Sequence, residues 1–189
     1  IPSAPLSVSV LSAPLTVITH FLPVIRALAD QSGIEIIGLG GRFVPAYDSF
    51  LGQATAAAAA ELQADLLIMS TTAVTEGVCY IQSQDTVITR RALIASSART
   101  VALVDHTKFG RRALHRLVDL ADLDRLVVDP DTPQEILAEL RGRAVAVDVA
   151  FDLAVDAGKN VRVQSSIIDI GATGMLDLTG SLSSPKLAG

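Results

Sequence analysis

Cysteine, tryptophan and long apolar runs are scarce or missing from the sequence, and each shortage excludes a class of protein. A single cysteine, Cys79, in 189 residues excludes an internal disulfide framework and a thiolate metal site. This usage fits a reducing compartment, and we expect a cytoplasmic protein. No apolar run reaches the roughly 18 residues that a membrane helix needs, so we expect no membrane contact for residues 15–150. We interpret Cys79 as a structural thiol, the alternative being a nucleophile.

Positive charge is also in short supply. Lys and Arg number 15 against 20 Asp and Glu, which gives a formal net charge of −5. The basic residues are dispersed along the chain rather than clustered. Nucleic-acid surfaces concentrate Lys and Arg because they neutralise phosphates, so we expect no direct nucleic-acid contact by this chain.

The common catalytic and cofactor motifs are missing. There is no GxSxG elbow, no Walker A loop and no GxGxxG fingerprint. No HExxH occurs, and the histidines are far apart in the sequence, so we expect no metal site and no cofactor. These histidines are His20, His106 and His115.

Small aliphatic residues dominate what is present. Half of the residues are hydrophobic but only 4% are aromatic. Apolar runs with strand character alternate with segments of helical spacing, which predicts βαβ units and therefore an α/β fold, a mostly parallel sheet with flanking helices. The expected strands cover residues 15–19, 34–39, 65–70, 101–104, 126–128 and 144–149. The expected helices cover 20–30, 49–64 with Ser49 as N-cap, 85–97, and a segment that begins at Pro133 behind a cap at Asp131 or Thr132.

The two ends of the chain follow a different pattern. Residues 1–14 contain three prolines and four serines, and we expect an irregular arm or an edge strand. Residues 151–189 lose the helical period and show short alternating runs broken by Gly, Ser and Pro, which predicts a β-rich tail. The central α/β domain then covers residues 15–150. The chain begins with Ile1, so we expect a fragment or a processed product.

Small or polar residues follow three of the expected strands: Gly40, Gly41 and Arg42 after one, Ser70, Thr71 and Thr72 after the next, and Asp105 and Lys108 after the third. The stretch VALVDHTKFGRR places Asp105 and Lys108 directly after a strand, where ligands of open α/β sheets bind. A capping Asp and a solvated Lys would give the same pattern. Gly40 and Gly41 follow another strand and permit either a close approach to a ligand or a tight turn.

Together these residues suit a phosphorylated polyol, because phosphate is bound by backbone amides, hydroxyls and cations. Arg91 is either a further cation of the site or part of a solvated helix face. Binding groups without an evident acid/base pair favour a sensor over an enzyme. The candidate binding residues are Gly40, Gly41, Arg42, Thr71, Thr72, Arg90, Asp105 and Lys108.

From Leu15 to about Ala150 the sequence resembles the C-terminal effector-binding domain of DeoR-type bacterial transcription regulators. DHTKFG and the Gly40–Gly41 turn weigh most in this resemblance. The other matching pieces are LTVITHFLPVIRALA, IEIIGLGGRF, the Ser49–Gly52 turn into a helix, ADLLIMSTTAVTEGV, TRRALIASS and LDRLVVDPDTPQEILAELRGRAVAV. The resemblance implies a fold related to ribose-5-phosphate isomerase and coenzyme A transferases, a sugar phosphate or related metabolite as effector, and a homo-oligomer.

Three departures from that family pattern stand out. The first strand and its DxGTT phosphate-binding turn should precede Leu15, but residues 1–14 contain no such motif. The winged helix-turn-helix that precedes the sensor in the family is also missing from this chain. Finally, Thr86 stands where the family usually has a Glu, five residues before Arg91.

The tail resembles a different family. AVDAGKNVRV and GMLDLTGSLSSPKLAG are similar to repeats of TamB/AsmA-like envelope proteins, which form a lipid-handling β groove. The alternative is a β extension of the preceding domain. We also expect that an apolar strand edge, left by the missing first strand, could recruit tail strands or another protomer.

Three functions are consistent with these observations, in decreasing order of support. The first is a sensor that binds a sugar phosphate near Gly40, Thr71, Asp105 and Lys108. The second is an isomerase-like enzyme in which Asp105 is the general base and Lys108 stabilises an enediolate. The third is a structural or lipid-contacting module that acts through the tail.

Overall fold

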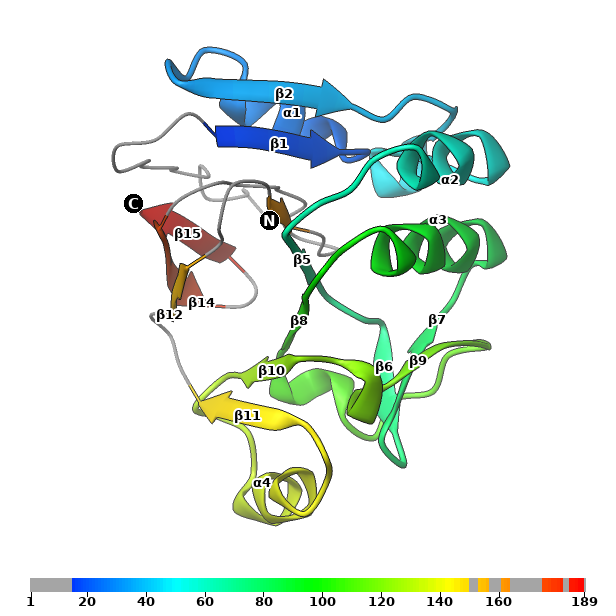
Figure 1. Ribbon diagram of the computed structural model, residues 1–189. Coiled ribbons are helices and arrows are strands. Elements are labelled where there is room, and N and C mark those ends of the chain that lie inside the picture. The colour runs from blue at the N-terminus through cyan, green and yellow to red at the C-terminus, as the bar shows by residue number, and fades with distance from the viewer. Residues whose placement is uncertain (1–14, 150–152, 157–160, 164–174, 182–183, 189) are drawn as a thin grey trace.

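The computed structural model describes residues 15–149 and, in the tail, the strand residues 153–156, 161–163, 175–181 and 184–188 (Figure 1). Its centre is a seven-stranded sheet in the order β11-β10-β8-β5-β13-β1-β2, in which every neighbouring pair is parallel. The expected α/β class with a mostly parallel sheet is confirmed. Its strands are β1 (Leu15–Thr19), β2 (Ile34–Gly38), β5 (Leu66–Met69), β8 (Thr100–Val104), β10 (Arg125–Val128), β11 (Ala146–Val149) and β13 (Val161–Val163).

The middle strands of the sheet form the core. All residues of β5 and β8 are buried, as expected for parallel strands that are covered on both faces. The helices that connect the strands supply this cover, and α2 and α3 lie side by side in Figure 1. Ala56 and Ala59 are buried on α2, where small side chains allow close packing. The four helices of the described residues are α1 (Leu22–Leu28), α2 (Gln53–Ala60), α3 (Gln84–Ala95) and α4 (Gln134–Arg141).

Two antiparallel units extend from the parallel sheet. One is a hairpin of β3 (Arg42–Val44) and β4 (Ser49–Leu51) with a 3₁₀ turn, η1 (Pro45–Tyr47), between them. The other is a three-stranded sheet in the order β6-β7-β9. Its strands are β6 (Ala73–Thr75), β7 (Val78–Ile81) and β9 (His115–Asp119). Sequence analysis predicted none of these five strands.

The hairpin corrects the prediction of a helix over residues 49–64. Ser49 is a strand residue that pairs with Val44, and its hydroxyl donates to the Tyr47 carbonyl at 2.9 Å instead of capping a helix. The helix begins only at Gln53, after Gly52, whose φ of 99° is a backbone conformation that glycine adopts without strain. The expected cap of the last helix is also wrong in detail. Pro133 is the N-cap, and the Thr132 hydroxyl donates to Asp129.

The described tail strands belong to two sheets. β12 (Leu153–Asp156), β14 (Met175–Ser181) and β15 (Ser184–Ala188) form an antiparallel sheet in the order β12-β14-β15, as the alternating pattern predicted. β13 lies instead between β1 and β5 of the main sheet, and it pairs with both. A tail strand therefore pairs with strand edges of the main sheet, as the sequence predicted for one of two possible partners, and it does so between β1 and β5.

Candidate functional site

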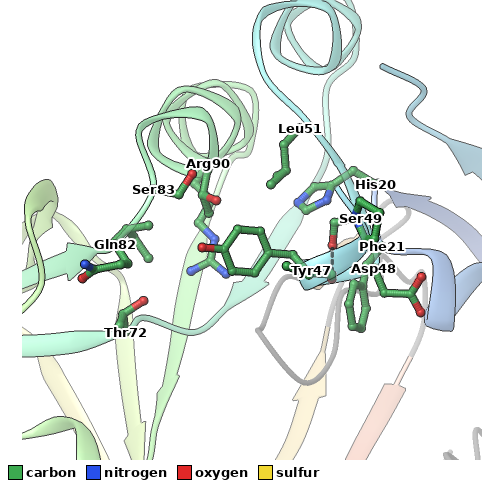
Figure 2. Close-up of a pocket in the computed structure, with 14 residues that line it drawn as sticks. His20, Phe21, Tyr47, Asp48, Ser49, Leu51, Thr72, Gln82, Ser83 and Arg90 are labelled. Carbon is green, nitrogen blue, oxygen red and sulfur yellow. Dashed lines mark hydrogen bonds between the residues drawn. The ribbon is translucent and has the colours of Figure 1, made fainter. Parts of the chain in front are cut away.

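A cavity of about 320 Å³ opens beyond the carboxyl ends of β1 and β5 (Figure 2). From β1 the chain passes outward to β2, whereas from β5 it passes in the opposite direction to β8 and β10. Ligands of open α/β sheets bind at such a switch point, because the connections diverge there and leave a crevice. The residues around the cavity are His20, Phe21, Pro45, Ala46, Tyr47, Asp48, Ser49, Leu51, Thr72, Ile81, Gln82, Ser83, Thr86 and Arg90.

The β3–β4 hairpin forms one wall of the cavity. Two backbone hydrogen bonds fix it to the chain that follows β1: the Leu22 amide donates to the Asp48 carbonyl at 3.0 Å, and the Phe50 amide donates to the His20 carbonyl at 2.9 Å. Asp48 has a φ of 49°, and this left-handed residue turns the chain from η1 into β4. The hairpin thereby brings Tyr47 and Asp48 to the border of the cavity: Figure 2 shows the Tyr47 ring directed toward Arg90, whereas the Asp48 carboxylate pairs with Arg26 at 3.9 Å.

A buried cation and a neutral imidazole lie deeper in the cavity. Arg90 reaches from α3 and is 6% exposed, and its guanidinium donates to the Ser70 carbonyl at the end of β5. His20 is 4% exposed. Burial, reinforced by the positive charge of Arg90, lowers the pKa of His20 to about 3. His20 is therefore uncharged near neutral pH, and Arg90 supplies the positive charge at this depth of the cavity.

Hydroxyl and amide groups line the side opposite the hairpin. Thr72 follows β5, and its backbone amide is held by the Tyr80 carbonyl at 3.1 Å. Gln82, Ser83 and Thr86 come from the start of α3 and the loop before it. Hydroxyls and amides that converge on a buried cation can bind a molecule with both hydroxyl groups and an anionic group.

The predicted pair Thr71 and Thr72 divides between two roles. Thr72 lines the cavity, whereas Thr71 is buried and its hydroxyl donates to the Tyr80 carbonyl at 2.8 Å. Beneath them, Cys79 is fully buried, and burial raises the pKa of its thiol to about 12. The structural interpretation of Cys79 is thus confirmed, because a nucleophilic cysteine needs an accessible thiolate.

The two adjacent arginines of α3 also differ. Arg90 lines the cavity as predicted. Arg91 points to β9, where its guanidinium donates to the carbonyls of Leu117 at 3.3 Å and Arg116 at 2.7 Å. Arg91 thus connects the helix to the three-stranded sheet rather than belonging to the cavity or to a fully solvated face.

The predicted glycines form a turn that packs against α2. Thr55 donates to the Gly40 carbonyl at 2.8 Å, and a Cβ on Gly41, whose φ is 140°, would collide with the Thr55 hydroxyl. Arg42 pairs with Asp85 at the start of α3. The structure therefore places Gly40, Gly41 and Arg42 outside the lining of the cavity, and their part in binding stays a prediction.

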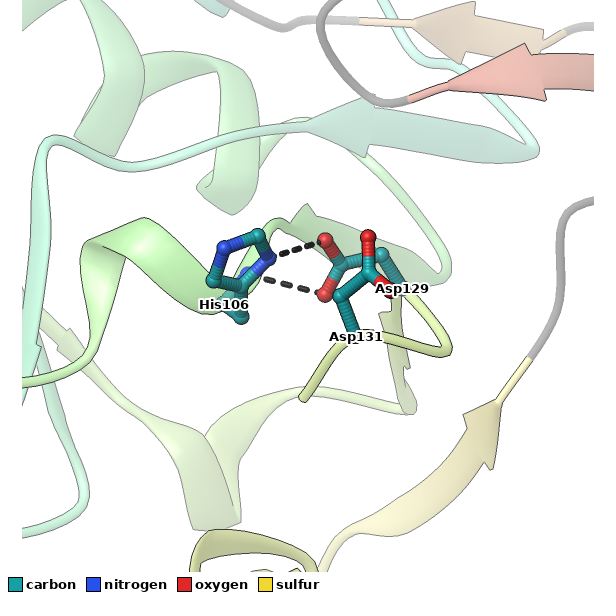
Figure 3. Close-up of side chains that lie close together, drawn as sticks. All are labelled: His106, Asp129 and Asp131. Carbon is teal, nitrogen blue, oxygen red and sulfur yellow. Dashed lines mark hydrogen bonds and ion pairs between the residues drawn. The ribbon is translucent and has the colours of Figure 1, made fainter. Parts of the chain in front are cut away.

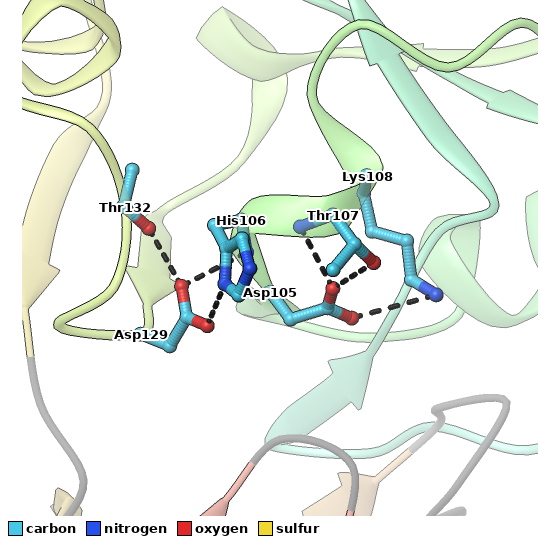
Figure 4. Close-up of polar contacts among 6 residues, drawn as sticks. All are labelled: Asp105, His106, Thr107, Lys108, Asp129 and Thr132. Atoms are coloured by element: carbon cyan, nitrogen blue, oxygen red, sulfur yellow. Dashed lines mark hydrogen bonds and ion pairs between the residues drawn. The ribbon is translucent and has the colours of Figure 1, made fainter.

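Asp105 and Lys108 follow β8 as predicted, and they pair with each other (Figure 4). Their Oδ2 and Nζ atoms are 3.4 Å apart, and Asp105 also accepts from the Thr107 amide at 3.0 Å, so it caps the short helix η2 (His106–Lys108). Burial would raise the pKa of Asp105, but the Thr107 hydrogen bonds and the Lys108 charge outweigh it and hold this pKa below its usual value. Neither residue lines the cavity, and their role in binding is untested.

Sequence reasoning missed most of the cavity lining. His20 directly follows a predicted strand, the same signal as Asp105, but the helical apolar spacing of residues 20–30 predicts a helix that begins at this residue. Tyr47, Asp48 and Ser49 gave no strand signal because β3 and β4 are only three residues long. Gln82 and Ser83 were overlooked because they precede the predicted start of α3.

Comparison with known proteins identifies the family. The sequence model of the DeoR C-terminal sensor domain matches residues 7–130, about two thirds of the chain. The chain belongs to the DeoR sensor-domain family. The match includes β1 and β5, which His20 and Thr72 follow, and α3, which carries Arg90; it confirms the resemblance to the DeoR sensor domain as far as residue 130.

Three relatives of this DeoR-family chain carry the names of transcriptional repressors. It is 25% identical over 128 residues to the HTH-type transcriptional repressor GlcR of Bacillus subtilis, covering 68% of this chain and 49% of that protein. It is 26% identical over 130 residues to a putative aga operon transcriptional repressor of Escherichia coli O157:H7, covering 68% and 48%. The lactose phosphotransferase system repressor of Staphylococcus aureus is 25% identical over 124 residues, covering 65% and 49%.

These matches also set limits. The chain spans about half the length of the curated relatives named above. None of these matches supports the resemblance of residues 151–189 to TamB/AsmA-like repeats, because the family match ends at residue 130. Among the described residues, the helices are all too short or too polar to cross a membrane.

Proposed function

We propose that the chain is a sensor domain that binds a phosphorylated sugar in the cavity beyond the carboxyl ends of β1 and β5, and that it serves a transcription regulator. The observation that carries this proposal is the buried guanidinium of Arg90 at the switch point of the sheet, with hydroxyl and amide groups around it. A sugar phosphate offers an anion for the guanidinium and hydroxyls for the polar lining. The repressor names of the relatives support the regulatory role.

The groups expected for isomerisation are poorly suited to that chemistry. Asp105 would have to accept a proton as general base, and an ideal base has a pKa near the working pH. Instead, the pKa of Asp105 lies below its ordinary value, and the carboxylate is engaged by Thr107 and Lys108. These contacts favour binding without turnover.

A thermal-shift titration of the full chain tests the proposal. A panel of hexose and pentose phosphates is compared with the unphosphorylated sugars and with inorganic phosphate. A ligand that binds the native state raises the melting temperature by mass action, so at least one sugar phosphate should give a saturable shift that its parent sugar does not. Absence of a shift with every sugar phosphate would overturn the proposal.

Matched variants locate the site. Thr72→Val removes a hydroxyl that lines the cavity, whereas Thr75→Val removes one outside it that bonds the Arg111 carbonyl. We expect the shift to shrink in Thr72→Val and to persist in Thr75→Val. Lys108→Ala tests the residues that follow β8. If only this variant abolished the thermal shift, the binding site would lie at Asp105 and Lys108 rather than in the cavity.

The expected homo-oligomer is a further part of the proposal. Light scattering of the purified chain at several concentrations measures its mass directly. A mass equal to that of one chain at every concentration would contradict the expected homo-oligomer.

A further inference from the structure

Three potential metal ligands lie close together beyond the carboxyl ends of β8 and β10 (Figure 3). His106 opens η2 after β8, Asp129 directly follows β10, and Asp131 lies two residues further on. One ligand atom from each residue lies within 4.8 Å of the other two. The sequence gave no warning of this cluster, because 23 positions separate His106 from Asp129 and only the pairing of β8 with β10 brings them together.

Asp129 is held in place before any ligand arrives. The residue is 6% exposed, and its Oδ1 accepts hydrogen bonds from the His106 amide at 2.8 Å and the Thr132 hydroxyl at 2.7 Å (Figure 4). Its Oδ2 faces His106 Nδ1 at 2.6 Å. Partners that fix a ligating carboxylate in this way are typical of metal sites, because they orient the ligand.

The charges around this cluster are unbalanced. Asp131 is exposed, and the described residues give it no hydrogen bond or ion pair. The nearby Lys108 pairs with Asp105 instead. A divalent cation placed between the Asp129 and Asp131 carboxylates and the His106 ring nitrogen would balance the carboxylate charges.

We propose that His106 Nδ1, Asp129 Oδ2 and an oxygen of Asp131 bind a divalent transition-metal ion of the Zn²⁺ type. One imidazole nitrogen with two carboxylate oxygens suits Zn²⁺ better than Mg²⁺, which prefers oxygen ligands only. On binding, the metal takes the place of the proton between Nδ1 and Oδ2, and the imidazole that binds it is neutral, with its one ring proton on Nε2. Water completes the coordination. This site is separate from the sugar-phosphate cavity, and it would link η2, which carries Lys108, to the loop after β10.

Calorimetric titration of the untagged full chain with ZnCl₂ at neutral pH tests this proposal, with MgCl₂ as the comparison ion. Asp131→Asn removes the charge of an exposed ligand to which the described residues give no hydrogen bond or ion pair, so this variant should fold normally. His106→Asn removes the imidazole. His115→Asn is the matched control, because this histidine lies on β9 outside the cluster. Circular dichroism verifies that each variant is folded.

We expect one equivalent of Zn²⁺ to bind the wild type and the His115→Asn variant alike, and Mg²⁺ to bind far more weakly. The affinity for Zn²⁺ should fall at least about tenfold in Asp131→Asn, since loss of even an outer-shell partner has an effect of that size. His106→Asn should lose binding further. Absence of Zn²⁺ binding to the wild type, or equal affinity in the Asp131→Asn and His115→Asn variants, would overturn the assignment.

Discussion

The buried imidazole of His20 makes the stability of this protein sensitive to acid in a way that can be calculated. Burial and the charge of Arg90 lower its pKa from 6.5 to about 3. In the unfolded chain, His20 regains its ordinary pKa and takes up a proton as the pH falls below 6.5. Since only the unfolded state binds this proton, the contribution of His20 to stability is complete above pH 6.5 and is lost as the pH falls toward 3.

The size of this loss follows from the two pKa values. Between pH 7 and pH 5 the unfolded state gains about 2 kcal/mol from protonation of His20, and the folded state gains almost nothing. Other groups titrate over the same range, so the wild type alone does not isolate this contribution. His20→Gln removes the titrating group and keeps a polar side chain of similar reach.

Urea unfolding of both proteins at pH 7 and pH 5 is the assay. The free energy of unfolding should fall by about 2 kcal/mol more in the wild type than in His20→Gln over this interval. The variant is expected to be less stable than the wild type at both pH values. The test compares only how much unfolding free energy each protein loses between pH 7 and pH 5. An equal loss in both proteins would refute the argument, because His20 would then titrate alike in the folded and unfolded states.

Three further predictions concern the turn, the thiol and the tail strand. Gly41→Ala should lower the free energy of unfolding in urea by about 1–3 kcal/mol, because the φ of 140° and the Thr55 hydroxyl leave no room for a Cβ. Gly40→Ala should lower it less, because the space around Gly40 is open. Equal losses in the two variants would contradict the close packing at Gly41. Cys79 should resist a thiol reagent at pH 8 in the native protein and react after unfolding, and rapid native reaction would show that its thiol is accessible. Arg162→Pro removes a backbone hydrogen-bond donor from β13, which pairs with β5. Amides of β5 should therefore exchange hydrogen faster in Arg162→Pro than in Arg162→Lys. Equal exchange in the two variants would show that pairing with β13 does not stabilise β5.

The central fold could be predicted from the sequence because its signals are local. The strands near Leu67 and Val101 are continuous apolar runs, and helices alternate with them, so the α/β class followed from periodicity alone. The short strands of the hairpin and of the β6-β7-β9 sheet could not be found in this way. They have three to five residues each, and their stability comes from pairing with segments that are distant in sequence.

The candidate site was only partly predictable for a related reason. Thr72 and Arg90 were recognised because their residue types suit phosphate, and both line the cavity. Asp105 carried a similar signal, but the preference of its carboxylate for Thr107 and Lys108 depends on the geometry of η2. Which strand ends border the cavity is set by the order of strands in the sheet, and the insertion of β13 between β1 and β5 had no counterpart in the local sequence beyond a short alternating run.

The most direct test of the central claim is a crystal structure of the full chain with the sugar phosphate that gives the largest thermal shift. Our account predicts that the ligand lies in the cavity beyond the carboxyl ends of β1 and β5, with its phosphate near the Arg90 guanidinium and its hydroxyls near Thr72 and the β3–β4 hairpin. A ligand bound beside Lys108, or anywhere outside this cavity, would contradict it.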